Sequence, residues 1–278
     1  MIVKEILADS YISKSKLPDA DYVINPYTGC PHKCIYCYAE FMKRFSGHGG
    51  EEWGDFLDVK KCFKPINIDC IPESSTILVG SVTDAYNPFE KKYETTRRIV
   101  EQLVLCKSRV EVLTKSDLVI RDIDVFKKFK NLYIGISLNT TDDSFRKQIE
   151  PYASSVEKRI ETLKTLSSEG IHTYLFVSPI FPELSDCFDL VEKTAPYIDY
   201  VCFENLNLRG AYLPRVMEFI EANYPEKYAL YQSIYWNKDM RYWEKLKEDL
   251  NDYCIDRNIN HRFYFYHDQL VKKRRDDN

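Results

Sequence analysis

The sequence predicts an α/β protein whose strands form an open, partial (β/α)6 barrel of the TIM type. Short runs of apolar, β-branched residues alternate six times with segments whose apolar residues recur at helical spacing. Strands that alternate with helices of this length imply a parallel sheet with right-handed crossovers. Six units are fewer than the eight that close a TIM barrel, so the predicted barrel is open.

Six segments carry the strand signal, and polar residues follow each of them. They are residues 21–24, 76–80, 109–113, 132–138, 171–177 and 198–203. In a parallel barrel the loops at the carboxyl ends of the strands gather at one face, and that face carries the working groups. The polar residues that follow these strands are therefore the first place to look for a site.

The connecting helices are predicted from caps and apolar spacing. Asn87 fits an N-cap, with Pro88 at the first helical position and Glu90 completing a capping-box pattern, and this helix should run to about residue 107. A second capping box, at residues 154–157, should begin a helix that Gly170 ends. Further helices are predicted at residues 39–45, 125–129 and 187–193.

The chain is predicted to divide into three parts. Residues 1–20 form an N-terminal extension, residues 21–210 the barrel core, and residues 211–278 a C-terminal extension that packs on the barrel. Within the core, the Gly-rich stretch 47–50 lacks the Lys-Ser/Thr of a phosphate-binding loop. We expect it to be a flexible lead into an excursion that ends near residue 75.

The C-terminal extension is rich in aromatic residues. Trp243, Leu246, Leu250 and Tyr253 keep helical spacing, which predicts a face that packs against the barrel. Residues 262–266 alternate like a strand. Aromatic side chains among Arg and Lys could also stack bases, but helical spacing favours ordinary packing. The basic run at residues 272–275 is expected to be a solvated terminus.

Composition narrows the class of protein further. The 278 residues are 44% hydrophobic, and no apolar run approaches the length of about 20 residues that spans a membrane. The N-terminus lacks a secretory signal, and the nine cysteines fit a reducing cytoplasm better than a disulfide framework. We therefore expect a cytoplasmic protein. The net charge of −4 argues against nucleic-acid binding by a broad field, although it allows a local basic groove.

The loop after the first predicted strand holds a C-x3-C-x2-C run, formed by Cys30, Cys34 and Cys37. Pro26 and Pro31 favour an irregular loop in which three thiolates could converge. Thiolates suit both zinc and iron–sulfur clusters. A structural zinc site and an ordinary cubane cluster each use four protein ligands. Three cysteines with no second C-x2-C elsewhere therefore suggest a cubane with one iron left open.

A zinc site stays open as the alternative at this point. His32 lies between the first two cysteines, so Cys30, His32, Cys34 and Cys37 could close a zinc knuckle. Only one residue separates Cys30 from His32, which makes a shared tetrahedron awkward. Cysteines that merely pack in the core are a further reading of the run.

The cysteine run, with the aromatic Tyr36 directly before its third cysteine, resembles the radical S-adenosylmethionine (SAM) superfamily. The longer string, with residues 25–27 ahead of it and 36–39 behind, resembles the spore-photoproduct-lyase-like (DNA repair photolyase-like) branch. More narrowly, it resembles the radical SAM mobile pair proteins, which are encoded as a pair on mobile elements. The resemblance extends from about residue 22 to residue 210.

This resemblance implies a [4Fe–4S] cluster held by Cys30, Cys34 and Cys37, with SAM as the second cofactor. The open iron would chelate the amino and carboxylate groups of SAM, and reductive cleavage would give a 5'-deoxyadenosyl radical that abstracts a hydrogen atom. Electrons would come from a flavodoxin- or ferredoxin-type donor. The branch further suggests a companion radical SAM protein as a partner, and a nucleotide or nucleic acid as the substrate.

Combining the resemblance with the strand ends gives the residues expected to contact SAM. Tyr36 should pack against the adenine or the cluster. The remaining candidates are polar residues that follow the second, third and fourth predicted strands: Ser81, Thr83, Asp84, Lys115 and Ser137. Each has an ordinary alternative, such as a turn residue for Asp84, a small buried residue for Ser137 and a solvated charge for Lys115.

One position departs from the pattern of the branch. Spore photoproduct lyases carry a hydrogen-donor cysteine just after the second strand, where this chain has Ser81. An O–H bond is stronger than an S–H bond, so Ser81 should be a poor hydrogen donor. Cys202, near the end of the sixth predicted strand, is the candidate replacement, with core packing as its alternative role.

The sequence therefore predicts a lyase-like radical SAM enzyme whose substrate is not specified. Two alternatives belong to other classes. One is a zinc-binding interaction protein, and the other is a cluster-bearing partner that serves a companion protein without turnover of its own.

Overall fold

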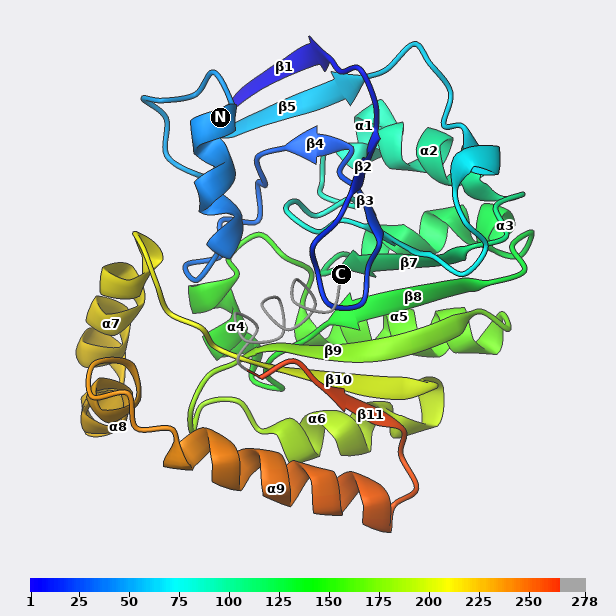
Figure 1. Ribbon diagram of the computed structural model, residues 1–278. Helices are drawn as coiled ribbons and strands as arrows, with labels where there is room; N and C mark the ends of the chain where they lie inside the picture. The colour runs from blue at the N-terminus through cyan, green and yellow to red at the C-terminus, as the bar shows by residue number, and fades with distance from the viewer. Residues whose placement is uncertain (266–278) are drawn as a thin grey trace.

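The computed structural model describes residues 1–265, which form two sheets (Figure 1). The larger sheet has the order β11-β10-β9-β8-β7-β6-β3-β2, and its neighbouring strands are parallel except for β2 and β3. Its strands are β2 (Ile12–Lys14), β3 (Tyr22–Ile24), β6 (Thr76–Val79), β7 (Arg109–Thr114), β8 (Leu132–Ser137), β9 (His172–Ile180), β10 (Tyr200–Asn205) and β11 (His261–Phe263).

The predicted partial barrel is confirmed. The six predicted strands correspond to β3, β6, β7, β8, β9 and β10, in that order across the sheet. The C-terminal extension adds β11, which pairs in parallel with β10 from Val201 to Phe203. The barrel sheet therefore has one more parallel strand than the six that were counted.

The smaller sheet lies beside the amino-terminal part of the barrel (Figure 1). It has the order β1-β5-β4, from β1 (Ile2–Leu7), β5 (Phe56–Lys61) and β4 (Tyr27–Thr28). Sequence patterning did not predict β4 or β5. The excursion that follows the Gly-rich stretch is therefore partly a strand, and β4 in this sheet leads directly into the cysteine loop.

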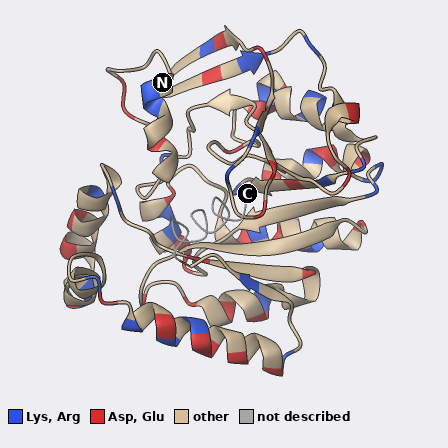
Figure 2. Ribbon diagram, viewed as in Figure 1, with Lys and Arg blue, Asp and Glu red and all other residues tan. Residues whose placement is uncertain are grey.

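Helices cover the outer face of the barrel (Figure 1). The α-helices are α1 (Glu90–Tyr93), α2 (Thr95–Leu103), α3 (Ile123–Phe126), α4 (Asp143–Ile149), α5 (Val156–Ser168), α6 (Cys187–Thr194), α7 (Tyr212–Asn223), α8 (Pro225–Tyr235) and α9 (Arg241–Asp256). Short 3-10 helices are η1 (Tyr38–Phe45), η2 (Ile68–Cys70), η3 (Asp117–Asp122) and η4 (Ala195–Tyr197). Acidic and basic residues mix along α9, whereas β9 and β10 carry few charges (Figure 2).

The helix predicted from Asn87 to residue 107 is wrong in its length. Asn87 is not the N-cap either, because that position is Phe89; the Asn87 Oδ1 accepts from the Phe89 amide at 3.0 Å in the turn that precedes α1. Glu94 has a φ of 48°, which breaks the segment into α1 and α2. Glu90 does not complete a capping box, since its buried carboxylate pairs with Arg121 at 2.8 Å.

The second predicted capping box is shifted by one residue. Ser155 is the N-cap of α5, and its side chain accepts from the Lys158 amide at 3.3 Å. Ser154 instead donates its hydroxyl to Asp117 at 2.5 Å, which ties the start of α5 to η3. The helix itself is present as predicted.

The strands divide the apolar core from the interior of the barrel. Alternate residues of the central strands face the helices and form the main core, while the others form an aromatic cluster inside the barrel. In that cluster the rings of Tyr174 and Tyr200 stack with centroids 4.9 Å apart. The guanidinium of Arg109 lies 3.6 Å from the ring centroid of Tyr133. Rings therefore fill the barrel interior toward the amino ends of the strands.

The predicted packing role of the C-terminal aromatics is confirmed. Tyr231, Tyr235 and Trp243 are all buried, whereas Trp236 is half exposed. Residue 266, the last of the predicted strand, and the basic run 272–275 lie outside the described residues. No helix within residues 1–265 has both the length and the apolar character needed to cross a membrane.

Candidate functional site

The cysteine loop lies at the carboxyl ends of the parallel strands, directly after β3 and β4. It is pressed against β5, because a Cβ added to Gly29 would lie 2.4 Å from the Phe56 carbonyl oxygen. Gly29 also has a φ of 90°, which glycine adopts without steric cost. The loop that carries the cysteines is therefore fixed from its first residue.

The three predicted ligands come together in this loop. Cys30 is buried, and Cys34 and Cys37 are partly buried; all three are free thiols. Burial raises the pKa of each thiol, and for Cys30 it does so to about 12, with Asp84 and Cys37 adding to the effect. Cys30 and Cys37 both raise the pKa of Cys34, so the three sulfurs lie within electrostatic reach of one another. This donor set fits a thiolate-bound iron–sulfur cluster.

His32 does not join the cysteines as a zinc knuckle would require. Its side chain is buried, and its Nδ1 lies 3.4 Å from Oδ2 of Asp84. Among the residues that the structure describes, no three His, Cys, Asp or Glu side chains are arranged to hold one metal ion. A zinc tetrahedron needs that convergence on one ion, whereas a four-iron cube bonds each cysteine to a different iron. The geometry therefore gives no support to the zinc alternative.

Asp84 connects the cysteine loop to β7. Its Oδ1 accepts from the Thr114 hydroxyl at 2.6 Å, and its Oδ2 accepts from the Lys115 amide at 2.8 Å. The same carboxylate accepts from the Tyr86 amide at 2.9 Å and faces His32. The acceptor capacity of this carboxylate is thus largely used within the protein, which fits the turn-organising alternative for Asp84.

Ser81 and Thr83 also hold the cysteine loop. The Thr83 hydroxyl donates to the Gly29 carbonyl at 2.7 Å. The Ser81 hydroxyl accepts from the Asn25 side chain at 2.9 Å, and the Val82 amide donates to the same Asn25 side chain at 3.0 Å. The segment after β6 therefore contacts both Asn25 and Gly29, which lie ahead of Cys30 in the chain.

Replacing Asp84 with alanine should destabilise the protein by about 1–3 kcal/mol, because buried donors from Thr114 and the Lys115 amide lose their acceptor. Urea denaturation of the metal-free protein measures this difference in the free energy of unfolding. Asp69→Ala, in the exposed helix η2, is the matched control and should change that free energy by less than about 0.5 kcal/mol. An equal effect of the two substitutions would contradict the role given to Asp84.

Tyr36 and Lys115 lie together beside the cysteines. The Lys115 ammonium is 6.0 Å from the centroid of the Tyr36 ring, and Phe181 packs edge-on against that ring at 5.6 Å. Burial lowers the pKa of Lys115, but Glu150 and Cys34 outweigh it, so the pKa is raised overall. Lys115 is therefore a cation held near Cys34 and Glu150 rather than a freely solvated charge.

A buried ion pair behind Tyr36 was not predicted. The Tyr36 hydroxyl and the Arg159 guanidinium both donate to the carboxylate of Glu150. The side chains of Arg159 and Glu150 are 0% exposed. One signal was present in the sequence, because Arg159 occupies the apolar stripe of α5 between Val156 and Leu163. An arginine in such a stripe indicates a buried partner.

The end of β8 carries polar groups that face the barrel interior. The Ser137 hydroxyl donates to the Ser178 carbonyl at 3.2 Å, and the Ser137 carbonyl accepts from Arg159 at 2.9 Å. Asn139 follows two residues later, just beyond the end of β8. Neither polar atom of its buried side chain has a hydrogen-bond partner within the described part of the chain. An unpaired buried amide is costly, so Asn139 marks a place for a polar ligand.

Cys202 lies deeper in the barrel than the other candidates. It is buried in the interior aromatic cluster with Tyr174 and Tyr200. Burial raises the pKa of its thiol to about 12, with Glu111 adding to the effect and Arg262 opposing it. Other cysteines, such as Cys106 and Cys187, belong to the main core outside the barrel. Cys202 therefore faces the interior, as a hydrogen donor would have to.

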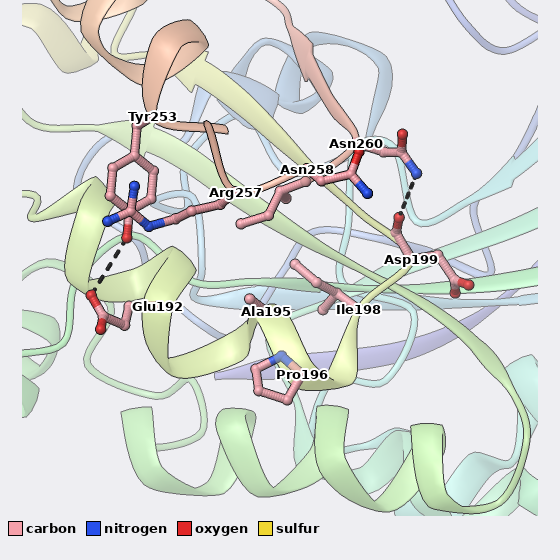
Figure 3. A pocket seen from close by; sticks show the side chains of 10 residues that line it. Glu192, Ala195, Pro196, Ile198, Asp199, Tyr253, Arg257, Asn258 and Asn260 are labelled. Atoms are coloured by element: carbon pink, nitrogen blue, oxygen red, sulfur yellow. Dashed lines mark hydrogen bonds between the residues drawn. The ribbon is translucent and has the colours of Figure 1, made fainter. Parts of the chain in front are cut away.

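A hollow of about 440 Å³ lies near the start of β10 (Figure 3). It is lined by residues 192–199 and by residues 253–260 at the end of α9. The Arg257 guanidinium lies over the face of the Tyr253 ring, 3.8 Å from the ring centroid (Figure 3). The hollow precedes β10, whereas the cysteine loop follows the carboxyl end of β3, so the two lie at opposite ends of the parallel strands.

Known proteins resemble this chain in sequence and fold. The sequence model of the radical SAM superfamily matches residues 24–191. An uncharacterised protein of Methanocaldococcus jannaschii is 40% identical over 226 residues, which cover 81% of this chain and 85% of that protein. A radical SAM Nα-GlyT isomerase of Pseudomonas phage M6 is 27% identical over 177 residues, which cover 61% of this chain and 36% of the isomerase.

The fold resembles a solved structure of spore photoproduct lyase complexed with dinucleoside spore photoproduct. The TM-score is 0.58 at 19% sequence identity, and the match covers 81% of this chain and 66% of the lyase chain. At this identity the likeness concerns the fold. The family match, by contrast, begins at the last residue of β3 and includes the whole cysteine loop and the four barrel strands β6 to β9. The chain belongs to the radical SAM superfamily of enzymes.

Proposed function

We propose that this protein is a radical SAM enzyme of the spore-photoproduct-lyase-like branch, close to the mobile pair proteins, and that it acts on a substrate bearing a nucleobase. The observation that carries the enzymatic part is the convergence of Cys30, Cys34 and Cys37 at the carboxyl ends of the barrel strands. Family membership implies a [4Fe–4S] cluster and SAM. When bound together, these cofactors supply a 5'-deoxyadenosyl radical that abstracts hydrogen from the substrate.

The residues around the cysteines have separate roles in this proposal. Ser81, Thr83 and Asp84 hold the loop by their side chains and offer backbone groups to SAM. Lys115 places a positive charge near the carboxylate of SAM. Ser137 and the unpaired amide of Asn139 offer polar contacts at the end of β8. Tyr36 is proposed to pack against the adenine of SAM or against the cluster, because its ring lies between Lys115 and Phe181.

Cys202 is the proposed hydrogen donor in place of Ser81. Its thiol is buried within the barrel interior, on the strand whose end carries Glu204 near the cysteine loop. Ser81 keeps its hydroxyl bonded to Asn25 and offers the stronger O–H bond. Reduction of the cluster is proposed to depend on a flavodoxin- or ferredoxin-type donor, with a companion radical SAM protein as a further partner.

Two observations support a nucleobase-bearing substrate. The first is the likeness in fold to spore photoproduct lyase, whose solved structure holds a dinucleoside spore photoproduct. The second is an exposed row of aromatic rings on η1, which we call the rim aromatics: Tyr38, Phe41 and Phe45, with exposed fractions of 46%, 42% and 70%. Exposed rings can stack bases without sequence preference.

The rim aromatics lie at the edge of the barrel mouth. The Tyr38 hydroxyl donates to the Ser81 carbonyl, and Glu40 pairs with Arg215 of α7 at 2.5 Å. The Arg44 guanidinium lies 5.9 Å and 5.7 Å from the ring centroids of Phe41 and Phe45. A row of rings with a cation beside it suits an anionic strand of bases that leads toward the cysteines.

Anaerobic reconstitution with iron and sulfide, followed by reduction with dithionite in the presence of SAM, tests the enzymatic proposal. We expect a filled cluster and the formation of 5'-deoxyadenosine, at a rate that a single-stranded oligonucleotide increases. No 5'-deoxyadenosine from fully loaded protein would contradict the proposal. If 5'-deoxyadenosine forms only when a companion protein is added, the result would instead support the alternative that this chain is a cluster-bearing partner without turnover of its own.

Phe45→Ala should weaken the binding of a fluorescein-labelled single-stranded oligonucleotide about 5- to 150-fold, because one stacked base is worth about 1–3 kcal/mol. Fluorescence anisotropy at a fixed salt concentration measures this change. Phe63→Ala is the matched control, since Phe63 is 87% exposed but lies away from η1, on the loop after β5. Equal affinities of the Phe45→Ala and Phe63→Ala variants would count against the rim aromatics as a base-stacking surface.

A further inference from the structure

The Gly-rich loop between η1 and β5 is a fixed cover over the outer side of the cysteine loop. It was expected to be flexible, yet His48 within it is buried. The Nε2 of His48 lies 2.9 Å from Oδ1 of the buried Asp58, and its ring stacks on Phe56 at 4.1 Å. Its Nδ1 lies 3.5 Å from Glu51. These contacts fasten residues 46–55 to β5.

The covering loop places Trp53 directly on the cysteines. Trp53 is buried and packs with Cys30, Ala39 and Phe56 in one apolar cluster, edge-on to Phe56 at 5.6 Å. Its indole Nε1–H donates to Sγ of Cys37 at 3.2 Å. A second contact fixes the loop from the other side, since Lys33 and Asp55 pair at 2.5 Å.

The choice of a sulfur as acceptor is informative. A buried indole N–H needs a partner, and a neutral thiol is only a weak acceptor. A thiolate that binds iron carries more negative charge and is a stronger acceptor. The bond from Trp53 to Cys37 therefore gains strength when the loop holds a cluster, and it gains more when that cluster takes up an electron.

We infer that Trp53 sets the reduction potential of the cluster through its N–H···S bond to Cys37. Hydrogen bonds to ligand sulfurs are among the factors that fix the potential of iron–sulfur clusters. A donor stabilises the reduced form, which has the more negative charge, so the bond raises the potential and makes the cluster easier to reduce. Trp53 is thus a positioning residue for electron uptake. The inference rests on the proposed cluster at Cys30, Cys34 and Cys37.

Trp53→Phe is the sharpest test, because it keeps an aromatic ring in the apolar cluster and removes the N–H. In a dye-mediated redox titration of the reconstituted full chain, followed by electron paramagnetic resonance, we expect a more negative midpoint. At a fixed solution potential the ratio of reduced to oxidised cluster should fall about three- to tenfold, and tenfold corresponds to about 59 mV for a one-electron couple. Trp236→Phe, at a half-exposed position on the C-terminal side of α8, is the matched control and should leave the midpoint unchanged.

The outcomes separate this inference from the proposed function. Wild-type protein that takes up no iron and sulfide would overturn both. A fully loaded Trp53→Phe variant with the wild-type midpoint would overturn the inference alone. If that variant fails to load, wild-type protein with ¹⁵N-labelled tryptophan decides the matter by electron–nuclear double resonance of the reduced cluster. A ¹⁵N coupling supports the bond, and its absence overturns it.

Discussion

Replacing Cys34 with alanine is expected to reduce the iron and sulfide content of the reconstituted protein severalfold and to lower 5'-deoxyadenosine formation to background. The reason is the number of ligands. If three cysteines hold the cluster and the fourth iron is left for SAM, the loss of one thiolate leaves two, and no spare cysteine lies in the same loop. Iron and sulfide analysis and chromatography of the reaction products measure the two effects.

Cys70→Ala provides the matched control for this experiment. Cys70 is an exposed free cysteine in η2, so its loss removes a thiol without touching the cysteine loop. The control variant should keep the cluster content and the activity of the wild type. A Cys34→Ala variant that loads a full cluster, or a Cys70→Ala variant that loses it, would show that the ligands had been assigned to the wrong residues.

The cysteine loop could be recognised from sequence as a candidate metal centre because the signal is local. Cys30, Cys34 and Cys37 lie within eight residues, and their spacing limits the metal centres that they can hold. Six strands of the barrel could also be predicted, since each is a short and mainly apolar run. In both cases, residues close together in the chain carry the pattern, and no knowledge of distant contacts is needed.

The individual roles of the predicted cofactor residues depend on distant contacts. Ser81, Thr83 and Asp84 were selected because they follow a strand, and they do lie beside the cysteine loop. Their side chains are bonded to Asn25, Gly29 and the end of β7, which the sequence did not indicate. A strand end predicts where a polar residue lies, but its partner across the fold decides what that residue holds.

The covering loop is a second case in which distant contacts decided the structure. Glycine at three of the four positions in residues 47–50 predicted flexibility, because glycine widens the range of backbone conformations. The intervening His48 overrides that tendency through its contacts with Asp58 and Phe56. Composition gave no sign of this, since Asp58 belongs to a strand that has no alternating pattern of its own.

Replacing Glu150 with glutamine is expected to destabilise the metal-free protein by about 3–5 kcal/mol, the cost of leaving one member of a buried ion pair without its partner. Arg159 would keep its hydrogen bonds to the Ser154 and Ser137 carbonyls, at 2.8 Å and 2.9 Å, but these carry no compensating charge. Burial raises the pKa of Glu150, but Arg159 and Lys115 outweigh it, so the pKa is lowered overall. The stabilisation is therefore present at neutral pH and is lost as the pH falls through that lowered pKa.

Urea denaturation at neutral pH measures the free energy of unfolding, and Glu161→Gln is the matched control on the same helix. Glu161 pairs with Lys164 at 3.4 Å, and both side chains are more than half exposed, so the control should change the free energy by less than about 0.5 kcal/mol. A cost below about 1 kcal/mol for Glu150→Gln would mean that solvent reaches the pair. A large cost should come with slower cluster loading, because the carboxylate that balances Arg159 also holds the hydroxyl of Tyr36, between Cys34 and Cys37.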